Sequence, residues 1–130
     1  MLLAAAKDGS PASLKRLEHE YALRSELDAA WAARPLALSR YKDRLTLVLE
    51  DPGGEPLDRL LDEPLEISEF PRIAVRLTIA LRRVHEGGLI HKDIKPGNVL
   101  VHRESGGVWL TGFGIASRLS REHHAPEPPR

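Results

Sequence analysis

Cysteine is absent from the 130 residues of this sequence, which excludes disulfides, thiolate zinc sites and a cysteine nucleophile. Net charge is absent as well, because 19 Lys and Arg residues balance 19 Asp and Glu residues, so no overall field favours nucleic acid or an anionic membrane. No apolar run approaches membrane-spanning length, and the opening run at 1–6 lacks the basic region of a signal peptide. We therefore expect a cytoplasmic chain with no nucleic-acid partner and no membrane insertion.

The composition that is present suits one folded domain. Hydrophobic residues make up 42% of the chain and charged residues 29%, which is typical of globular rather than disordered proteins. A chain of this length can bury one modest core. We expect residues 1–120 to form that domain, and the Pro- and charge-rich segment 121–130 to be a flexible tail.

Two stretches have the apolar periodicity of amphipathic helices. The first, at 13–27, is preceded by Ser10, a capping residue. Glu20 lies beside its apolar side, where a lone glutamate is usually a solvated surface charge. The second begins at Ser68 as its cap and ends at the glycine pair 87–88. Its apolar positions are Phe70, Ile73, Ala74, Leu77, Leu81 and Val84.

Short apolar runs bounded by turn residues predict strands. Lys42 and Asp43 separate two such runs and indicate a hairpin, and the first residues of the chain could also lie in a strand. The expected elements are strands at 34–41, 44–51, 99–102 and 108–112, and a short helix at 57–61.

The loop that follows the second long helix reads HKDIKPGN, at 91–98. Asp93, Lys95 and Asn98 lie on it at i, i+2 and i+5, and Pro96 restricts its backbone. A carboxylate can accept a hydroxyl proton, an ammonium can neutralise a transferring phosphoryl group, and an amide oxygen can ligate Mg²⁺. This spacing therefore points to phosphate and metal chemistry.

The same loop resembles the protein-kinase catalytic loop, His-Arg-Asp-x-Lys-Pro-x-Asn, with Lys92 as the departure because it loses the bidentate fork of arginine. The resemblance implies a catalytic base at Asp93, a γ-phosphate contact at Lys95 and a Mg²⁺ ligand at Asn98. It also implies ATP and Mg²⁺ as cofactors and a protein as substrate or signalling partner. The aminoglycoside-kinase-like family is a competing match, but Lys95-Pro96 and the Phe113-Gly114 pair favour protein kinases.

Flanking segments extend the resemblance. Residues 17–27 resemble the αC helix, with Glu20 as its ion-pairing glutamate. Glu50 and Asp51 fall at the adenine-facing hinge, so these two and Glu20 are candidate cofactor-binding residues. The implied fold is α+β, the central portion of a bilobal kinase domain that is incomplete at both ends. Its division would be an N-lobe remnant at 1–50 and the start of the C-lobe at 51–120.

Several parts of the kinase pattern are missing. Gly112-Phe113-Gly114 stands where kinases have Asp-Phe-Gly, so Gly112 replaces the metal-binding aspartate, and no Asp or Glu lies between 105 and 121 to substitute for it. The opening residues hold no Gly-rich loop, and the strand-lysine position falls near Leu2 or Leu3. Lys7 is a poor substitute, and the Ala-Pro-Glu triplet at 125–127 lies too close to Gly112 to end a full activation segment.

These features define two hypotheses. The first is a Ser/Thr-type kinase domain, inactive or impaired as this chain. The alternative is a pseudokinase or truncated kinase remnant that acts only through protein contacts. The segments at 19–27, 47–54 and 110–122 also resemble the kinase-like N-terminal domain of bacterial multi-domain sensor (hybrid histidine) kinases. An incomplete domain leaves sheet edges and apolar helix faces uncovered, so we also expect poor solubility.

Overall fold

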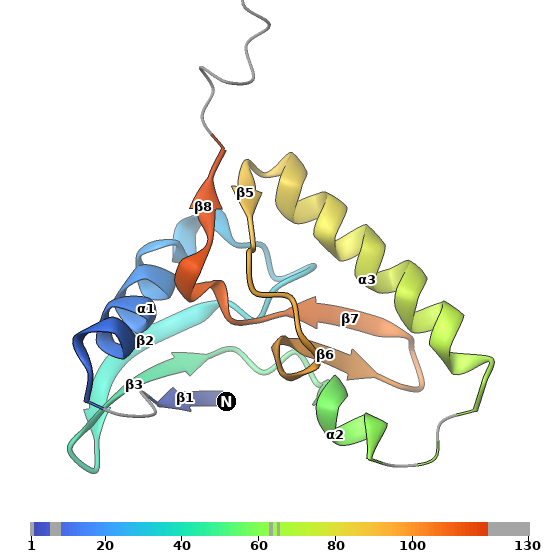
Figure 1. Cartoon of the computed structure of the whole chain (residues 1–130), viewed down its shortest axis with the longest axis horizontal. Coiled ribbons are helices and arrows are strands. Elements are labelled where there is room, and N and C mark those ends of the chain that lie inside the picture. Colours follow the sequence, from blue (N-terminus) through green and yellow to red (C-terminus); the bar gives the residue numbers. More distant parts are fainter. Residues whose placement is uncertain (1, 6–8, 63, 65, 120–130) are drawn as a thin grey trace, which may run out of the picture.

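The fold is α+β, as expected, in a computed structural model that describes residues 2–5, 9–62, 64 and 66–119. Helices and short 3₁₀ turns flank three small antiparallel sheets (Figure 1). The expectations for Lys7, for the tail at 121–130 and for the triplet at 125–127 lie outside the described residues. Within the described residues, no helix combines the length and apolar character needed to cross a bilayer.

The first sheet has the order β1-β3-β2 and contains β1 (Leu2–Ala5), β2 (Pro35–Tyr41) and β3 (Arg44–Leu49). The hairpin prediction is confirmed, because β2 and β3 pair antiparallel on either side of Lys42 and Asp43. Both turn residues have positive φ, 51° and 63°, as a two-residue type I′ turn requires. The expected opening strand is also present, with Ala4 opposite Leu47.

Helix α1 (Pro11–Ala22) packs against this sheet. Its first turn is capped by the Ser10 hydroxyl, which accepts a hydrogen bond from Ser13 N at 3.2 Å. The helix expected over 13–27 ends earlier than predicted, and a 3₁₀ turn, η1 (Arg24–Glu26), follows it. The physical reason is packing, because Leu23 and Leu27 on either side of this turn are both buried in the core. The apolar periodicity therefore continued past the end of the helix.

The rest of the chain builds on helix α3 (Glu69–Glu86), which lies against β7 (Gly107–Leu110). Strand β6 (Val99–His102) pairs with β7 on one side and with β4 (Glu55–Pro56) on the other. The remaining elements are α2 (Leu57–Leu61), β5 (Leu89–Ile90) paired with β8 (Ser117–Arg118), η2 (Pro96–Asn98) and η3 (Phe113–Ile115). The short helix at 57–61 is confirmed, and the strand expected at 108–112 ends at Leu110.

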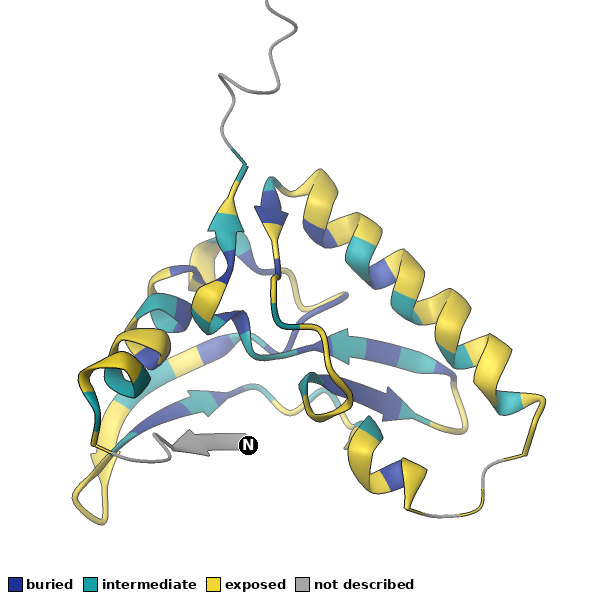
Figure 2. Ribbon diagram, viewed as in Figure 1, coloured by how far each residue is buried: buried dark blue, intermediate teal, exposed yellow. Residues whose placement is uncertain are grey.

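Two details of α3 differ from expectation. Ser68 lies at the N-cap but forms no capping side-chain hydrogen bond, because its backbone is already helical. Phe70 and Ala74, assigned to the apolar stripe, are exposed. The core contacts instead come from Ala80 and Val84, with Ile73, Leu77 and Leu81 partly buried beside them. The fully buried residues of α3 therefore lie in its second half, as Figure 2 shows.

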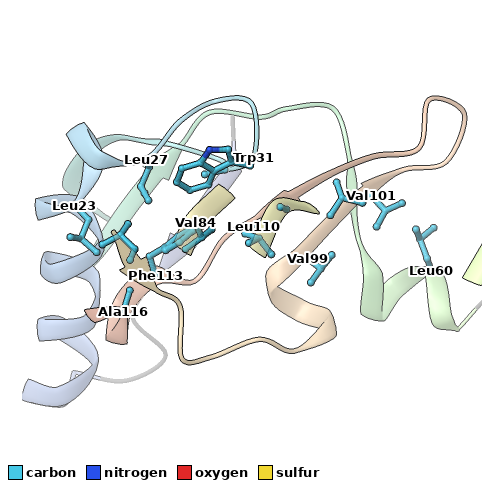
Figure 3. Packing of buried hydrophobic residues seen from close by; sticks show 14 residues of the cluster. Leu23, Leu27, Trp31, Leu60, Val84, Val99, Val101, Leu110, Phe113 and Ala116 are labelled. Atoms are coloured by element: carbon cyan, nitrogen blue, oxygen red, sulfur yellow. The ribbon is translucent and has the colours of Figure 1, made fainter. Parts of the chain in front are cut away.

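One hydrophobic cluster joins the two ends of the described chain (Figure 3). Leu23, Leu27 and Trp31 from the first third pack with Leu110 and Phe113 from the last part. The backbone reinforces this contact, because Ala33 N donates to Leu110 O at 3.0 Å and Leu110 N donates to Trp31 O at 2.9 Å. The cluster thus places α1 beside the segment that follows β7, where the candidate site lies.

Candidate functional site

The loop between β5 and β6 is anchored by His91, whose side chain is buried. Its Nδ1 accepts a hydrogen bond from Asp93 N at 3.0 Å, and its Nε2 lies 2.6 Å from Thr111 O. These partners define a neutral ring with the proton on Nε2, since a backbone N–H needs an acceptor and a carbonyl needs a donor. Burial lowers the pKa of the His91 imidazole, opposed by the Thr111 carbonyl and the Asp93 carboxylate. His91 therefore fixes the loop to the segment after β7.

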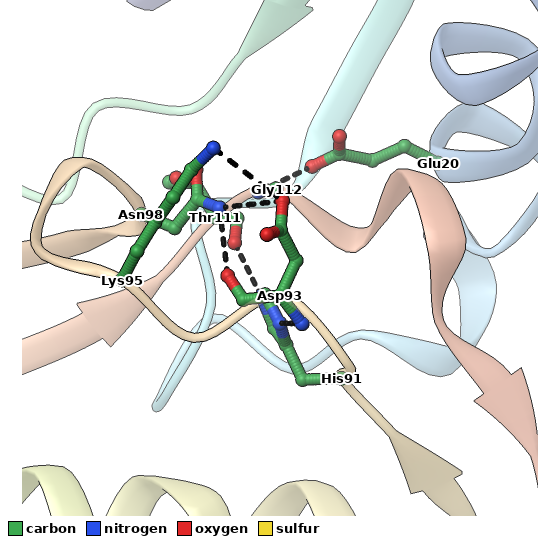
Figure 4. Close-up of polar contacts among 7 residues, drawn as sticks. All are labelled: Glu20, His91, Asp93, Lys95, Asn98, Thr111 and Gly112. Atoms are coloured by element: carbon green, nitrogen blue, oxygen red, sulfur yellow. Dashed lines mark hydrogen bonds and ion pairs between the residues drawn. The ribbon is translucent and has the colours of Figure 1, made fainter. Parts of the chain in front are cut away.

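Asp93, Lys95 and Asn98 come together on this loop, as their spacing predicted (Figure 4). Asn98 Nδ2 donates to Asp93 O at 2.9 Å and to Asp93 Oδ2 at 3.2 Å. Lys95 Nζ lies 3.8 Å from the same Oδ2, with both side chains partly exposed. The arrangement presents a carboxylate and an ammonium to solvent, so it can accept a proton and contact an anionic group.

Glu20 reaches the site from α1 and is only 4% exposed. Because Glu20 is buried, it is not the solvated surface charge that a lone helix glutamate usually is. Its Oε2 accepts a hydrogen bond from Gly112 N at 3.1 Å. Burial raises the pKa of the Glu20 carboxyl, and the N–H groups of Phe113 and Gly112 oppose this shift. Within the described residues, its carboxylate is thus bound by backbone N–H groups rather than by a lysine.

Gly112 adopts a left-handed conformation, φ 76° and ψ 40°. A Cβ at this position would lie 2.5 Å from Asn98 Oδ1 and would overlap Asn98 Cγ and Nδ2. Neither a metal-binding carboxylate nor the first carbon of one fits beside Asn98 as it stands. Among the described residues, no group of three His, Cys, Asp or Glu side chains could hold a metal ion. Mg²⁺ is commonly bound through one or two carboxylates together with waters and substrate phosphates, and the loop at 91–98 offers the carboxylate of Asp93 and the amide oxygen of Asn98 as such donors.

The two hinge candidates use their side chains locally. Glu50 Oε1 lies 2.7 Å from Arg34 Nε, and Asp51 Oδ1 accepts a hydrogen bond from Gly53 N at 2.9 Å. These contacts, made within the part of the chain that the structure describes, direct both carboxylates to neighbours of the hinge rather than to the loop at 91–98. Glu50 thus ties the end of β3 to Arg34, and Asp51 stabilises the turn at Gly53.

Two contributors to the site had no structural role assigned from the sequence, although Phe113 was named as part of the Gly112-Phe113-Gly114 triplet. Thr111 supplies the carbonyl that binds His91, and the ring of Phe113 lies 4.6 Å from the His91 ring and 6.3 Å from the Trp31 ring, between centroids. A backbone carbonyl leaves no signal in residue type. For Phe113, the apolar character of the segment after β7 was the available signal, but its partners are distant in the chain.

Comparison with known proteins gives an independent view of the chain. A family model, described as protein kinase domain, matches residues 4–128. Serine/threonine-protein kinase LATS1 of Mus musculus is 34% identical over 101 residues, covering 76% of this chain and 9% of its own length. Serine/threonine-protein kinase Warts of Drosophila melanogaster is 32% identical over 103 residues, covering 78% and 9%. Citron rho-interacting kinase of Rattus norvegicus is 31% identical over 106 residues, covering 79% and 5%. The chain spans less than a tenth of the length of these relatives.

Proposed function

Since this chain belongs to the protein kinase family, we propose that it is a kinase-type domain whose phosphotransfer is lost or strongly impaired and whose role is exercised through protein contacts. The observation that carries this proposal is Gly112. It stands where the family resemblance implies a metal-binding aspartate, and its Cα faces the Asn98 side chain with no room for a Cβ. Each ~1.4 kcal/mol of lost transition-state stabilisation lowers a rate tenfold, so loss of one metal ligand is a severe handicap.

The retained residues define what chemistry the site could still supply. In the proposed roles, Asp93 accepts the proton of a substrate hydroxyl, Lys95 contacts a phosphate, and Asn98 orients Asp93. Lys95 Nζ lies 3.8 Å from Asp93 Oδ2 and is partly exposed, so its ammonium can also contact a phosphate oxygen beside Asp93. ATP is the proposed ligand of this site, with the backbone near Glu50 and Asp51 on the adenine side.

A working Ser/Thr kinase is the second candidate function, and the intact loop favours it. Asp93, Lys95 and Asn98 all lie within one connected set of contacts. LATS1 and Warts are Ser/Thr kinases by name, which supports a protein rather than a small molecule as the partner. We also propose that the domain belongs to a cytoplasmic signalling protein of the bacterial sensor-kinase type, because the segments at 19–27, 47–54 and 110–122 resemble that group.

The test is a thermal-shift titration of the chain with ATP, with and without Mg²⁺ or Mn²⁺, alongside a γ-phosphate transfer assay on a generic protein substrate. We expect no metal-dependent stabilisation and no transfer. Asp93→Asn and Asn98→Ala are the site variants, and Asp43→Asn, at the exposed hairpin between β2 and β3, is a matched control outside the site. A Mg²⁺-dependent shift and transfer that both vanish in the site variants, but persist in the control, would establish the kinase alternative instead.

A further inference from the structure

A groove lies where α3, β7 and the turn at 28–31 meet, and α3 runs along β7 in Figure 1. Its volume is about 190 Å³, below the roughly 300–1,000 Å³ of pockets that enclose a small molecule or a cofactor. It therefore suits a single side chain of a partner rather than a nucleotide. The lining residues that matter here are Trp31, Arg76, Ile79, Arg83, Gly107 and Trp109.

Arg76 and Arg83 contribute positive charge to this groove from one face of α3. They are seven positions apart, so they lie about two helical turns, or about 10 Å, from each other along the helix axis. Both are exposed. Within the part of the chain that the structure describes, neither forms an ion pair or a side-chain hydrogen bond. Two guanidinium groups are thus available to an anionic ligand.

Acidic side chains near the groove are bound elsewhere. Glu69 Oε1, at the start of α3, lies 2.7 Å from Arg103 Nη2, and Glu86 Oε2, at its end, lies 3.7 Å from Arg82 Nε. In the turn at 28–31, Asp28 Oδ1 accepts a hydrogen bond of 2.8 Å from the backbone N–H two residues further on. Among the described residues, the groove therefore keeps its positive charge without an acidic partner.

The apolar part of the groove lies between the two arginines. Ile79 is on the same face of α3 and is 44% exposed. Trp31 is only 6% exposed. Trp109 is partly buried, and its ring lies so close to Gly107 that a Cβ there would be 2.5 Å from it. The two indoles therefore form walls of the groove rather than the exposed stacking platform that single-stranded nucleic acids use.

We propose that this groove docks an acidic segment of a partner protein, with an apolar side chain against Ile79 and a carboxylate at each arginine. In an extended segment, residues at i, i+2 and i+4 point to the same side and span about 13 Å. Long arginine side chains can bridge the difference from the 10 Å or so between Arg76 and Arg83. The pattern that fits is therefore acidic-x-apolar-x-acidic.

A second copy of this chain fits the groove less well. Two such grooves facing each other around a two-fold axis would place arginines opposite arginines, and like charges across an interface are costly. The inference deepens the proposed function, and it rests on that function only in assigning a protein partner to the domain. Docking is measured without nucleotide, so its result is independent of the test for phosphotransfer.

Intrinsic fluorescence reports on occupation of the groove, because Trp31 and Trp109 both line it and are the two tryptophans of the sequence. The probe is the synthetic peptide Gly-Ser-Asp-Ser-Leu-Ser-Asp-Ser-Gly. It is titrated into the full chain below the concentration at which sedimentation detects self-association. We expect a saturable change in fluorescence that weakens as salt is added. Peptides with both Asp changed to Asn, or with Leu changed to Ser, should bind much more weakly.

Variants of the chain locate the binding. The double variant Arg76→Glu, Arg83→Glu should raise the dissociation constant roughly tenfold or more, because two attractive pairs become repulsive. The matched control is Arg40→Glu, Arg59→Glu, which changes the net charge equally at exposed positions outside the groove and should bind as the parent does. Ile79→Ser should also weaken binding, but without changing its salt dependence. Urea unfolding checks that each variant is folded.

Three results would overturn the proposal. The first is no saturable change with the parent chain, or an equal loss of binding in the control variant. The second is tighter binding of a 12-residue oligothymidylate than of the peptide, weakened by the same arginine changes, which would assign the groove to nucleic acid. The third is a parent dimer in sedimentation that the Arg76→Glu, Arg83→Glu variant dissociates, which would assign the groove to a second copy.

Discussion

The Glu20 carboxylate and the Gly112 backbone N–H, 92 positions apart in the chain, are joined by a hydrogen bond of 3.1 Å. This contact ties α1 to the segment that follows β7. It also gives the buried carboxylate of an αC-type glutamate a partner that carries no positive charge. The charged form of Glu20 is therefore poorly compensated, and this has a measurable consequence for stability.

We predict that Glu20→Gln stabilises the protein at neutral pH. Burial raises the pKa of Glu20 above its ordinary value of 4.5, so the folded state binds the proton more tightly than the unfolded state. The contribution of Glu20 to stability is then fully present below pH 4.5 and is lost as pH rises through the raised pKa. Glutamine stays neutral and still accepts a hydrogen bond from Gly112 N–H.

Urea unfolding of both proteins between pH 4 and 8 checks this, with Glu18→Gln on the exposed side of α1 as control. The advantage of the Glu20→Gln variant should grow with pH, while the Glu18 substitution should leave the pH profile unchanged. A glutamine variant less stable than the parent at pH 7 would contradict the prediction, because the backbone N–H groups would then outweigh the cost of burying the charge.

His91→Phe should destabilise the protein by about 1–3 kcal/mol, because it leaves a buried N–H of Asp93 and a carbonyl of Thr111 without their partner. His91→Phe should also make the unfolding free energy fall less steeply at acidic pH, the acid limb of its pH profile. Burial lowers the pKa of His91 below 6.5, so its stabilising contribution is complete above pH 6.5 and is lost as pH falls through the lowered pKa. Equilibrium unfolding across pH 5 to 8 measures both effects, and His85→Phe on the exposed face of α3 is the control. An acid limb as steep as that of the parent would argue against this role.

Phe113→Ala should cost about 3–5 kcal/mol of unfolding free energy, the usual range for a buried aromatic ring. Phe113 is fully buried, whereas Ile115 is 38% exposed in the same short turn. Ile115→Ala should therefore cost much less, and the pair isolates ring packing from changes in the turn. Chemical denaturation monitored by Trp31 and Trp109 fluorescence gives both values. Equal costs would mean that the turn itself, not the ring, holds this segment.

The exposed apolar side chains of α3 should make the chain self-associate. Val75 is 59% exposed and Ile79 is 44% exposed, and exposed apolar patches promote association. The double variant Val75→Glu, Ile79→Glu should remain monomeric to higher concentration in sedimentation experiments, with a change in stability within about 1 kcal/mol. Thr78→Glu adds charge to the same helix without removing an apolar group and should help less. A parent chain that is monomeric at all concentrations would refute the expectation of poor solubility.

Local sequence signals were sufficient where the structure depends on neighbouring residues. The loop at 91–98 brings Asp93 and Asn98 into contact because Pro96 and a 3₁₀ turn bend the chain between them. The hairpin at Lys42 follows from two β-prone runs separated by two residues. The long helix was predicted with its correct ends because Ser68 precedes the apolar stripe and a glycine pair follows it.

Features that depend on distant partners were not predictable in this way. The burial of Glu20 is set by a backbone amide 92 positions away, and no local pattern carries that information. The β5–β8 pair involves only two residues on each side, too few to show periodicity. Phe70 and Ala74 matched the apolar stripe, yet both are exposed, although Ile73 beside Ala74 packs against the core. The overlap of Asn98 with a Cβ at Gly112 is likewise a three-dimensional fact.

The hydrophobic cluster around Phe113 also bears on how the chain folds as it leaves the ribosome. Leu23 and Leu27 are synthesised well before Phe113 and Ala116, which pack in the same cluster. Contacts of such high sequence separation slow folding, and apolar surface that awaits its partner is prone to aggregation. The nascent domain therefore cannot complete this cluster until the short segment at 113–116 emerges, and the apolar side chains of its earlier members lack those partners until then.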